Sequence, residues 1–509
     1  MTAPNKVDSN TTSLAIAVET SLKVLPGTPI WQSMEPNSYS DFYGSFTNTN
    51  RTPINPDRYI KKGVITDLDA KGGFNIDFME SNLQTLLMGF VFADALEKPD
   101  TASLSAAAIP ITSVVASTKT FAAASGLGSF KANHIVWNSG FTNALNNGLD
   151  IVASATATTI VETATKTDEA TPPAGANIEV VGFQFPSADA SISAVSATGV
   201  TFATVATDLT TLGLSVGEWV FLGGDGANSK FATCPTGYAR IASIAAHAIV
   251  FNDTTFVPVV DAGTGKLIQL FFGKVIKNQP YANIKRRTFQ LERQIGNDGN
   301  GVQTEYLLGA VPDQLTLNIP NSGKLNTDLT FVAMDYQTQT GTVGPKAGTR
   351  VAAVNENAYN TSSDIYRQKI SIYDPLNINN AALFAYASDG KIVINNNVKS
   401  SKAIGVLGAF DATVGDFTVT GTLTAYFSTV AAVSAIRANS DIGFSSIAAH
   451  KNMGFIVDIP LLSLSDGKLT ISKDSPVNLG ISMNAAQSTL GSTILFNFFT
   501  YLPTVAMPS

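Results

Sequence analysis

The sequence predicts a mainly β protein with one or a few short helices, and three observations lead to this fold class. Apolar and polar residues alternate in many short segments, which is typical of half-buried strands. One segment instead places its apolar residues at helical spacing. Charged residues make up only 14% of the chain, against roughly a quarter in typical soluble domains, and Thr, Ser, Asn, Ala and Gly replace them.

The period-two alternation predicts individual strands. Along such a segment successive side chains point to opposite faces of a sheet, so one face is buried and the other is solvated. The clearest segments are residues 13–18, 288–293, 314–319, 391–394 and 417–427.

Residues 81–92 are the predicted helix. Leu83, Leu86, Leu87 and Phe90 recur at intervals of three and four residues, which places them on one face of a helix. We therefore expect this helix to pack on a sheet.

Length, charge and cysteine content limit the possible classes of protein. The 509 residues exceed one ordinary core, and length alone predicts about three to four domains. The net charge of -7 argues against a nucleic-acid-binding protein, because affinity for phosphates comes from clustered Lys and Arg. The single cysteine, Cys234, excludes a disulfide or a thiolate cluster within one chain.

No targeting or membrane segment is expected. The first ten residues are polar and lack an apolar run, which argues against a cleaved secretory signal. The most apolar stretch, residues 494–507, is interrupted by polar residues and a proline, and it is shorter than the roughly 20 apolar residues that span a bilayer. We therefore expect synthesis in the cytosol.

Residues 99–270 are predicted to be an inserted region, because charged residues become sparser there and Ala, Ser and Thr dominate. Two repeated β-modules are expected inside it, at about residues 112–165 and 192–255. The aligned segments are residues 148–161 with 237–250, residues 133–137 with 217–221, and Phe121 with Phe202.

The rest of the chain is expected to form two further blocks. Residues 341–363 lack an apolar period and are rich in turn formers, so we predict a linker or long loop there. Residues 1–98 together with 271–340 would then form one domain, and residues 364–509 a second one.

Histidines and the cysteine show no catalytic or metal-binding pattern. His134, His247 and His450 are not spaced as metal ligands, so packed or surface histidines are favoured. Cys234 has no basic neighbour closer than Lys230, and an inert thiol is favoured over a reactive one.

Four other candidate sites have simpler structural explanations. Residues 263–267 lack the full phosphate-loop pattern and predict a tight turn. Residues 296–301 lack the bidentate Glu of a calcium loop and predict a hairpin connection. A solvated strand face, rather than paired catalytic carboxylates, is predicted for Asp67, Asp69 and Asp77. A salt-bridge patch between subunits is predicted for the basic residues Lys274, Lys277 and 285–287. No catalytic, cofactor-binding or metal-binding residue is assigned, and we expect no enzyme.

The order of elements resembles that of the major tail tube proteins of long-tailed, siphovirus-type bacteriophages. An opening strand, a Pro-Gly loop with a tryptophan, a long polar arm, a strand pair with a Gly-rich turn and one helix follow one another, and further strands resume after the inserted region. The matching segments are residues 14–20, 25–37, 51–75, 288–294, 305–315 and 329–331, with tube-type strands also at 417–427, 455–460 and 477–483.

The resemblance implies tail-tube-type β-sandwich or barrel domains, two per chain, and a structural virion protein. Its rings would stack into the hollow tail tube, with long arms joining one ring to the next, and the genome would pass through the lumen without specific binding. Two domains per chain would let three chains imitate a six-fold ring, so a trimer is favoured over a hexamer. Tape measure, tail terminator and distal tail proteins are the implied partners, and the inserted modules would decorate the outside.

An acidic lumen would suit this function, because a negative wall repels phosphates and lets DNA slide. The main alternative is a β-rich surface adhesin or receptor-binding virion protein, which would share the Thr, Asn and Gly content. Aromatic clusters in loops would favour that alternative, whereas Trp31, Trp137 and Trp219 are scattered.

Overall fold

The computed structural model describes residues 7, 9–98, 109–353, 356–372, 382–384 and 386–508. Over these residues it contains 31 β-strands and two α-helices, so the predicted mainly β fold is confirmed. The polar start of the chain at residues 1–6 and the start of the inserted region at 99–108 lie outside the described residues.

The chain divides into two compact units. Unit 1 comprises Met1–Ala93, Ile284–Tyr359 and Ser388–Leu423, and unit 2 comprises Asp94–Asn283, Asn360–Ala387 and Thr424–Ser509. The contacts thus group residues 388–423 with unit 1 and the region 99–270 with unit 2. These units are groups of residues in spatial contact. The predicted division of the chain into two tube domains, an inserted region and a linker stays a prediction.

Unit 1 contains helix α1 and twelve strands, together with most of a thirteenth, β27. Of these twelve, only β24 has a residue outside the unit, its first one. Its elements are β1 (Thr12–Val18), β2 (Ile30–Met34), β3 (Pro36–Arg51), β4 (Lys61–Asp77), α1 (Glu80–Val91), β18 (Phe289–Asn297), β19 (Val302–Ile319), β20 (Asn326–Ala333), β21 (Asp335–Gln339), β22 (Thr349–Val351), β24 (Ala387–Asn395), β25 (Lys399–Lys402) and β26 (Ala409–Thr413), while β27 (Thr418–Tyr426) runs from unit 1 into unit 2.

The long strand β19 organises unit 1, because it belongs to two sheets. Its first half pairs with β18 and β21, and its second half pairs with β20 and β24. From β18 the sheet continues through β1 and β2 to β22, and from β20 it continues through β4 to β3. Gly309, between the two halves, has φ +59°, and a Cβ there would lie 2.9 Å from Met334 Cγ. Only glycine fits this bend without strain.

Helix α1 covers the apolar face of the β4–β20–β19 sheet, as the spacing of its leucines predicts. Leu83, Leu86, Leu87 and Phe90 are fully buried. The ring of Phe90 lies 5.3 Å from that of Phe331 in β20. A Cβ on Gly89 would come within 2.7 Å of the Phe289 ring, so this glycine permits the close approach of helix and sheet.

Unit 2 contains helix α2 and the remaining strands. Its elements are β5 (Ile111–Val115), β6 (Thr120–Ala123), β7 (His134–Ser139), β8 (Gly148–Ala155), β9 (Thr159–Glu162), β10 (Asn177–Gln184), β11 (Ala190–Ser196), β12 (Gly199–Thr204), β13 (Trp219–Leu222), β14 (Gly237–Ala245), β15 (Ala248–Thr254), β16 (Gln269–Phe271), β17 (Lys274–Lys277), β23 (Ile365–Ile372), α2 (Ala431–Arg437), β28 (Ile442–His450), β29 (Met453–Thr470), β30 (Asn478–Ala485) and β31 (Leu495–Phe499).

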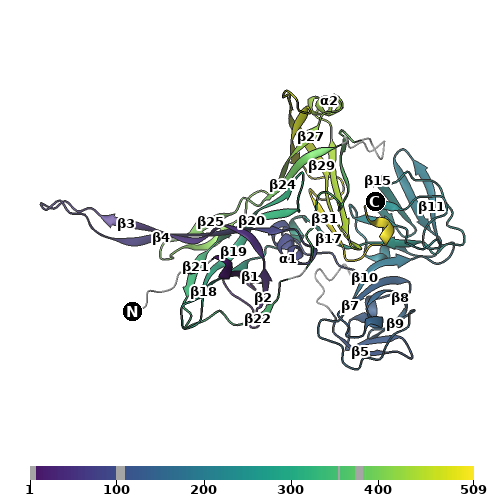
Figure 1. The fold of residues 1–509 in the computed structure, drawn as a ribbon, viewed down its shortest axis with the longest axis horizontal. Coiled ribbons are helices and arrows are strands. Elements are labelled where there is room, and N and C mark those ends of the chain that lie inside the picture. Colours follow the sequence, from purple (N-terminus) through teal and green to yellow (C-terminus); the bar gives the residue numbers. More distant parts are fainter. Residues whose placement is uncertain are drawn as a thin grey trace. The chain divides into compact units, whose positions relative to one another are not determined.

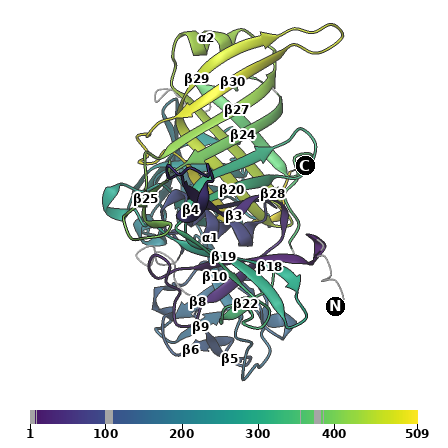
Figure 2. The ribbon, with the colours of Figure 1, turned by 90° about the vertical axis from the view of Figure 1, so that its left-hand side faces the viewer.

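A second long strand, β29, repeats the pairing pattern of β19. Its first half pairs with β28 and β31, and its second half pairs with β30. Figure 2 shows α2 beside β29. Helix α2 could not be predicted from the sequence, because seven Ala-rich residues are too few to establish a helical period.

The two long strands stand at the same place in two similar series of elements. The first series is β1, β3, β4, α1, β18, β19, β20 and β21, and the second is β23, β24, β27, α2, β28, β29, β30 and β31. In both series the first strand pairs with the strand before the long one. The next two strands after the long one pair with its second and first halves respectively.

Strands β5 to β16 form a separate sheet of twelve strands. We call β5–β10 module 1 and β11–β16 module 2. The strand order is β5-β6-β9-β8-β7-β10 in module 1 and β11-β12-β15-β14-β13-β16 in module 2, and β10 pairs with β16 at the centre. Equivalent registers, Asn138 opposite Gly148 and Leu222 opposite Gly237, relate the two modules residue by residue.

Residues 341–363, which the sequence predicts to be a linker or loop, contain one strand. Strand β22 pairs in parallel with β2, and Thr349 N donates to Pro29 O at 2.9 Å. Three residues at a sheet edge are too short to show alternation, so the sequence did not reveal this strand.

Candidate assembly surfaces

The three histidines contact groups of their own chain. His134 is buried, and burial together with Lys131 lowers its pKa to about 4. His450 Nδ1 lies 3.0 Å from Asp364 Oδ1. His247 Nδ1 lies 3.1 Å from Thr207 O.

Cys234 and the glycine-rich segments also have local structural roles. Burial raises the pKa of the Cys234 thiol. Gly263 and Gly265 both have positive φ, as expected of a tight turn. Among the described residues no group of three or more His, Cys, Asp or Glu side chains is arranged to hold a metal ion.

Residues 298–301, within the predicted hairpin connection 296–301, link β18 to β19. Asp298 accepts hydrogen bonds from the amides of Asn300 and Gly341, both at 2.9 Å. These bonds lower the pKa of Asp298. The carboxylate therefore stabilises the turn.

Basic residues 285–287 make contacts within unit 1. Arg286 pairs with Asp411 at 3.1 Å, and Arg287 Nη1 donates to Ala93 O at 2.7 Å. The predicted salt bridges to another subunit stay a prediction.

Lys274 and Lys277 make their contacts within unit 2. Lys274 lies 3.3 Å from Glu179, and Lys277 donates to Val216 O at 3.0 Å. Each lysine thus has a partner in its own unit.

The β3–β4 hairpin is the first candidate assembly surface. Figure 1 shows it extending beyond the other strands of unit 1. Its outer part and its tip expose many large apolar side chains, which in a soluble protein mark a contact surface. These residues are Tyr43, Phe46, Ile54, Tyr59, Ile60, Val64 and Ile65.

Ion pairs support the hairpin near its base. Lys402 of β25 binds Asp67 and Asp69 of β4, the latter at 2.7 Å. The hydrogen bond from Lys402 is the main cause that lowers the pKa of Asp67. These carboxylates therefore lie on a solvated strand face, as predicted, and are held by a lysine far away in the sequence.

The polar face of the β3–β4–β20–β19 sheet is the second candidate surface. It carries a row of amides and carboxylates that bond to one another across the strands, with Lys324 bound to Asp77. The bonds run from Asn37 to Asn75 (3.0 Å) and Asp77 (2.6 Å), from Asn75 to Asn326 (2.9 Å) and Asp328 (2.7 Å), and from Asn318 to the same two residues (2.9 and 2.7 Å). These mutual bonds hold the polar side chains in place.

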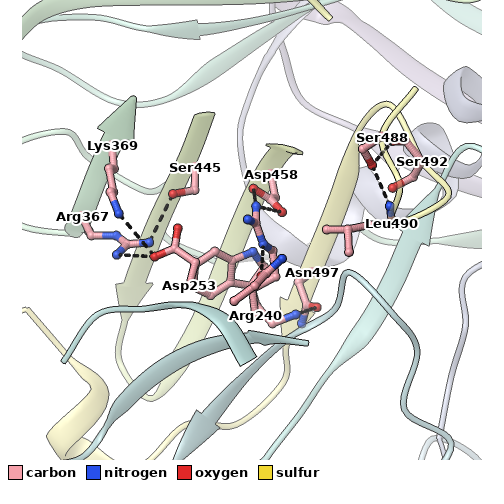
Figure 3. Close-up of polar contacts among 12 residues, drawn as sticks. Arg240, Asp253, Arg367, Lys369, Ser445, Asp458, Ser488, Leu490, Ser492 and Asn497 are labelled. Atoms are coloured by element: carbon pink, nitrogen blue, oxygen red, sulfur yellow. Dashed lines mark hydrogen bonds and ion pairs between the residues drawn. The ribbon is translucent and has the colours of Figure 1, made fainter. Parts of the chain in front are cut away.

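A buried ionic network in unit 2 joins module 2 to the sheet of β23, β28 and β29 (Figure 3). Both oxygens of Asp458 accept from Arg240 Nη1 at 3.2 Å. Asp253 lies 3.4 Å from both Arg367 and Lys369. Burial raises the pKa of Asp458. Although burial also acts to raise it, the pKa of Asp253 is lowered by the surrounding cations.

Aromatic rings complete the contact between module 2 and this sheet. Arg240 and Arg367 lie over the Trp219 ring, 5.8 and 5.3 Å from its centre. The Tyr238 ring lies 6.1 Å from that of Phe499 in β31. This contact was not predicted from the sequence, although charges within strand segments, such as Arg240 and Asp253, were a usable signal.

The tryptophans are packed rather than gathered in loops. Trp31 and Trp219 are fully buried, and the Trp137 ring stacks on Tyr501 at 5.0 Å.

No helix in the described part of the chain combines the length and the hydropathy needed to cross a membrane.

Comparison with models of known protein families gives a match over most of the chain. A family model described as phage tail tube protein matches residues 9–486. Among curated proteins none matches the chain. The matched range includes the first series of elements, the second series except β31, the hairpin and both modules.

Proposed function

Because the chain belongs to the phage tail tube protein family, we propose that it forms the hollow tail tube of a siphovirus-type phage and conducts the genome during ejection. Members of this family are structural virion proteins of the tail that assemble into a tube. The stacked rings, the genome passage and the siphovirus type are the parts proposed here. The observation that carries the proposal is the family match over nearly the whole chain.

We further propose two tube domains per chain and three chains per ring. The two series of elements, built around β19 and β29, support a duplicated tube domain. Three copies of a duplicated chain would give six pseudo-equivalent positions, whereas a single domain would need six chains.

The β3–β4 hairpin is proposed to join one ring to the next. Its exposed apolar tip supports this role, because a solvated monomer gains nothing from such a surface. Replacing Ile54, Tyr59 and Ile60 by serine is expected to leave rings intact and prevent their stacking. Leu145→Ser, at an exposed leucine of module 1, is the matched control and should leave stacking unchanged.

The row of hydrogen-bonded amides and carboxylates in unit 1 is proposed to face the lumen. Side chains that satisfy one another have little free capacity to bind phosphates, and Asp77 and Asp328 add negative charge without a basic cluster. DNA would therefore slide over this face without specific binding.

Modules 1 and 2 are proposed to decorate the outside of the tube. Tape measure, tail terminator and distal tail proteins are the further partners expected at the two ends, with synthesis in the host cytoplasm. Deletion of residues 99–270 tests the decoration role, since tubes should still form without them.

Negative-stain electron microscopy of the purified protein over a concentration series tests the main proposal. Rings or tubes with a central hole of DNA width are expected. A compact monomer at every concentration would contradict it and would favour the adhesin alternative.

A further inference from the structure

Lys166 of module 1, in the segment after β9, has a side chain that is buried between two carboxyl groups. Its Nζ atom lies 2.7 Å from Asp150 Oδ2 and 2.7 Å from Glu162 Oε2. The exposed fraction is 3% for the side chains of Lys166 and Asp150 and 0% for that of Glu162. The centre of the Phe121 ring lies 5.3 Å from Nζ. An amine and a carboxyl group are therefore in contact at a place from which water is largely excluded.

Hydrogen bonds hold the Asp150 carboxyl group in a fixed orientation. Its Oδ1 atom accepts from the amides of Ile151 (2.7 Å) and Ala164 (3.2 Å) and from Thr163 Oγ1 (2.8 Å). Its Oδ2 atom contacts Lys166 and also accepts from the amide of Ala164 at 3.2 Å. Fixed donors of this kind stabilise the negative charge that develops on an oxygen when a nucleophile attacks the carbon that carries it. Asp150 Cγ is thus positioned and polarised for attack by the amine.

Glu162 contacts the same amine and is suited to carry a proton. Asn138 Nδ2 donates to both of its oxygens, at 3.0 and 2.8 Å, and these bonds orient the carboxyl group. Burial raises the pKa of Glu162 to about 7, although Lys166 acts to lower it. A group whose pKa lies near the ambient pH both accepts and releases a proton readily. Glu162 can therefore act as general base and general acid towards Lys166.

A second buried lysine in unit 2, Lys98, has a simpler environment. Its Nζ atom lies 2.6 Å from Glu218 Oε1 and 2.6 Å from the carbonyl oxygen of Gly273. In the described part of the chain no second carboxyl group is bonded to this amine. Lys98 thus has a carboxyl partner but no group that could relay a proton, which makes it an internal comparison for Lys166.

We infer that Lys166 and Asp150 condense spontaneously to an isopeptide bond between Lys166 Nζ and Asp150 Cγ. The ion network is the state before this reaction. A proton moves from the Lys166 ammonium group to the Asp150 carboxylate that it contacts, and the neutral amine attacks Cγ. Glu162 takes a further proton from the nitrogen and returns it to the departing hydroxyl group. One C–N bond forms, one C–O bond breaks and one molecule of water leaves, so Glu162 ends unchanged and no further reactant is needed.

Contact and burial both favour this condensation. Reactants that the fold holds together behave as if they were at very high concentration. The neutral amide also replaces two buried charges, whose removal from water is costly. The bond ties β8 to the segment after β9, in a chain whose single cysteine excludes an internal disulfide. It lies within one chain, so it does not depend on the proposed tube function.

Mass spectrometry of the purified full-length protein, denatured before measurement, tests this bond. The wild type is expected to be lighter than its sequence by one water, about 18 Da. Tandem mass spectrometry of a digest should find a branched peptide that joins residues 150 and 166. This measurement needs no variant, so it does not depend on the folding of a mutant. A wild type of full sequence mass would overturn the inference, and so would a branched peptide that joins Lys98 to Glu218 instead.

Three variants test the assigned roles. Lys166→Arg keeps the positive charge without the amine and should have its full sequence mass. Glu162→Gln keeps the size of the side chain but removes the proton relay, so the bond should form at least about tenfold more slowly; hydrogen exchange of module 1 checks that this variant is folded. Lys131→Arg, at an exposed lysine of module 1, is the matched control and should still lose one water.

Two results with these proteins would contradict the assigned chemistry. Cross-linking of Glu162→Gln at the rate of the wild type would overturn the role of Glu162. A loss of ammonia, about 17 Da, with Asn138 as the linked residue would overturn Asp150 as the electrophile.

Discussion

Module 1 buries charged and amide side chains at positions where module 2 buries hydrocarbon. The shared strand order and register make the positions directly comparable. Asn138, Asp150 and Glu162 in module 1 correspond to Leu222, Ala239 and Phe251 in module 2, and all six are buried. The same arrangement of strands therefore tolerates two different interiors.

The polar interior of module 1 is a connected network. Asn138 Nδ2 donates to both oxygens of Glu162, at 3.0 and 2.8 Å. Lys166 Nζ lies 2.7 Å from both Asp150 and Glu162. Paired and hydrogen-bonded charges can be buried, but they add little net stability over a packed apolar core.

Each module has one carboxylate that holds its closing loop by hydrogen bonds, and we call this contact the acidic clamp. In module 1 the backbone of Glu169 forms a β-bridge with Val114 of β5, and its carboxylate accepts hydrogen bonds from the amides of Thr142 and Asn143. In module 2 the backbone of Asp261 forms a β-bridge with Ile192 of β11, and its carboxylate accepts hydrogen bonds from the amides of Thr233 and Cys234. The repeat thus preserves the closing loop more closely than the interior, because unpaired buried amides cost free energy in any core.

Removal of the Lys166 ammonium group should have the largest effect on the stability of module 1. Lys166→Met leaves Asp150 and Glu162 buried without their counter-charge, which should lower the free energy of unfolding of module 1 by about 3–5 kcal/mol. Chemical denaturation with hydrogen exchange resolved by module measures it. Lys266→Met, at a partly exposed lysine of module 2 that donates to Ala227 O, is the control, and equal losses in the two variants would contradict the comparison.

The acidic clamp of module 2, formed by Asp261, should make the stability of this module depend on pH. Burial acts to raise the pKa of Asp261, but hydrogen bonds from Thr233, Gly263 and Cys234 lower it to about 2. Because the folded pKa lies below the unfolded one, this group stabilises the fold above about pH 4, and the stability is lost as pH falls towards 2. The contribution is about 2 kcal/mol.

Unfolding of the wild type and Asp261→Asn between pH 2 and 6 tests this pH dependence. The variant should be less stable at pH 6 and should lose less stability on acidification. Parallel pH curves for the two proteins would contradict the role of the carboxylate.

Replacing the whole polar interior of module 1 by apolar residues should lower its stability less than removing Lys166 alone. Asn138→Leu, Asp150→Ala and Glu162→Phe introduce the residues of module 2, and Lys166→Met removes the remaining charge, so module 1 gains an apolar interior like that of module 2. Since all charges leave at once, the free energy of unfolding should fall by no more than about 2 kcal/mol or even rise. A loss as large as that of Lys166→Met alone would show that the network itself determines the fold.

The smallest effect is expected where the clamps differ by one side chain. Cys234 of module 2 corresponds to Asn143 of module 1, whose side chain also donates to Glu169. Cys234→Asn can form the same bond to Asp261, so the stability should change by less than about 1 kcal/mol. The same denaturation experiment measures this change, and a loss above about 2 kcal/mol would show that the two clamp loops are not interchangeable.

Several elements could be predicted because their signal is local. Alternation located β1, β18, β19, β24 and β27, and leucine spacing located α1, since burial of one face imposes a period on neighbouring residues. The aligned segments around residues 148–161 and 237–250 likewise correspond to the same strand pair in the two modules.

Other features depended on tertiary structure, because nothing local indicates which groups pair with one another. Arg240 and Asp458 are 218 residues apart, and no pattern within either strand indicates that they meet. The choice of β24 as the partner of β19 depends on which free edge lies within reach in the folded chain. The sequence by itself thus determined many of the strands and the helix α1, through periods of two and of three to four residues. Only the tertiary structure decided which edges and which buried charges pair, since such pairing depends on distance in space rather than along the chain.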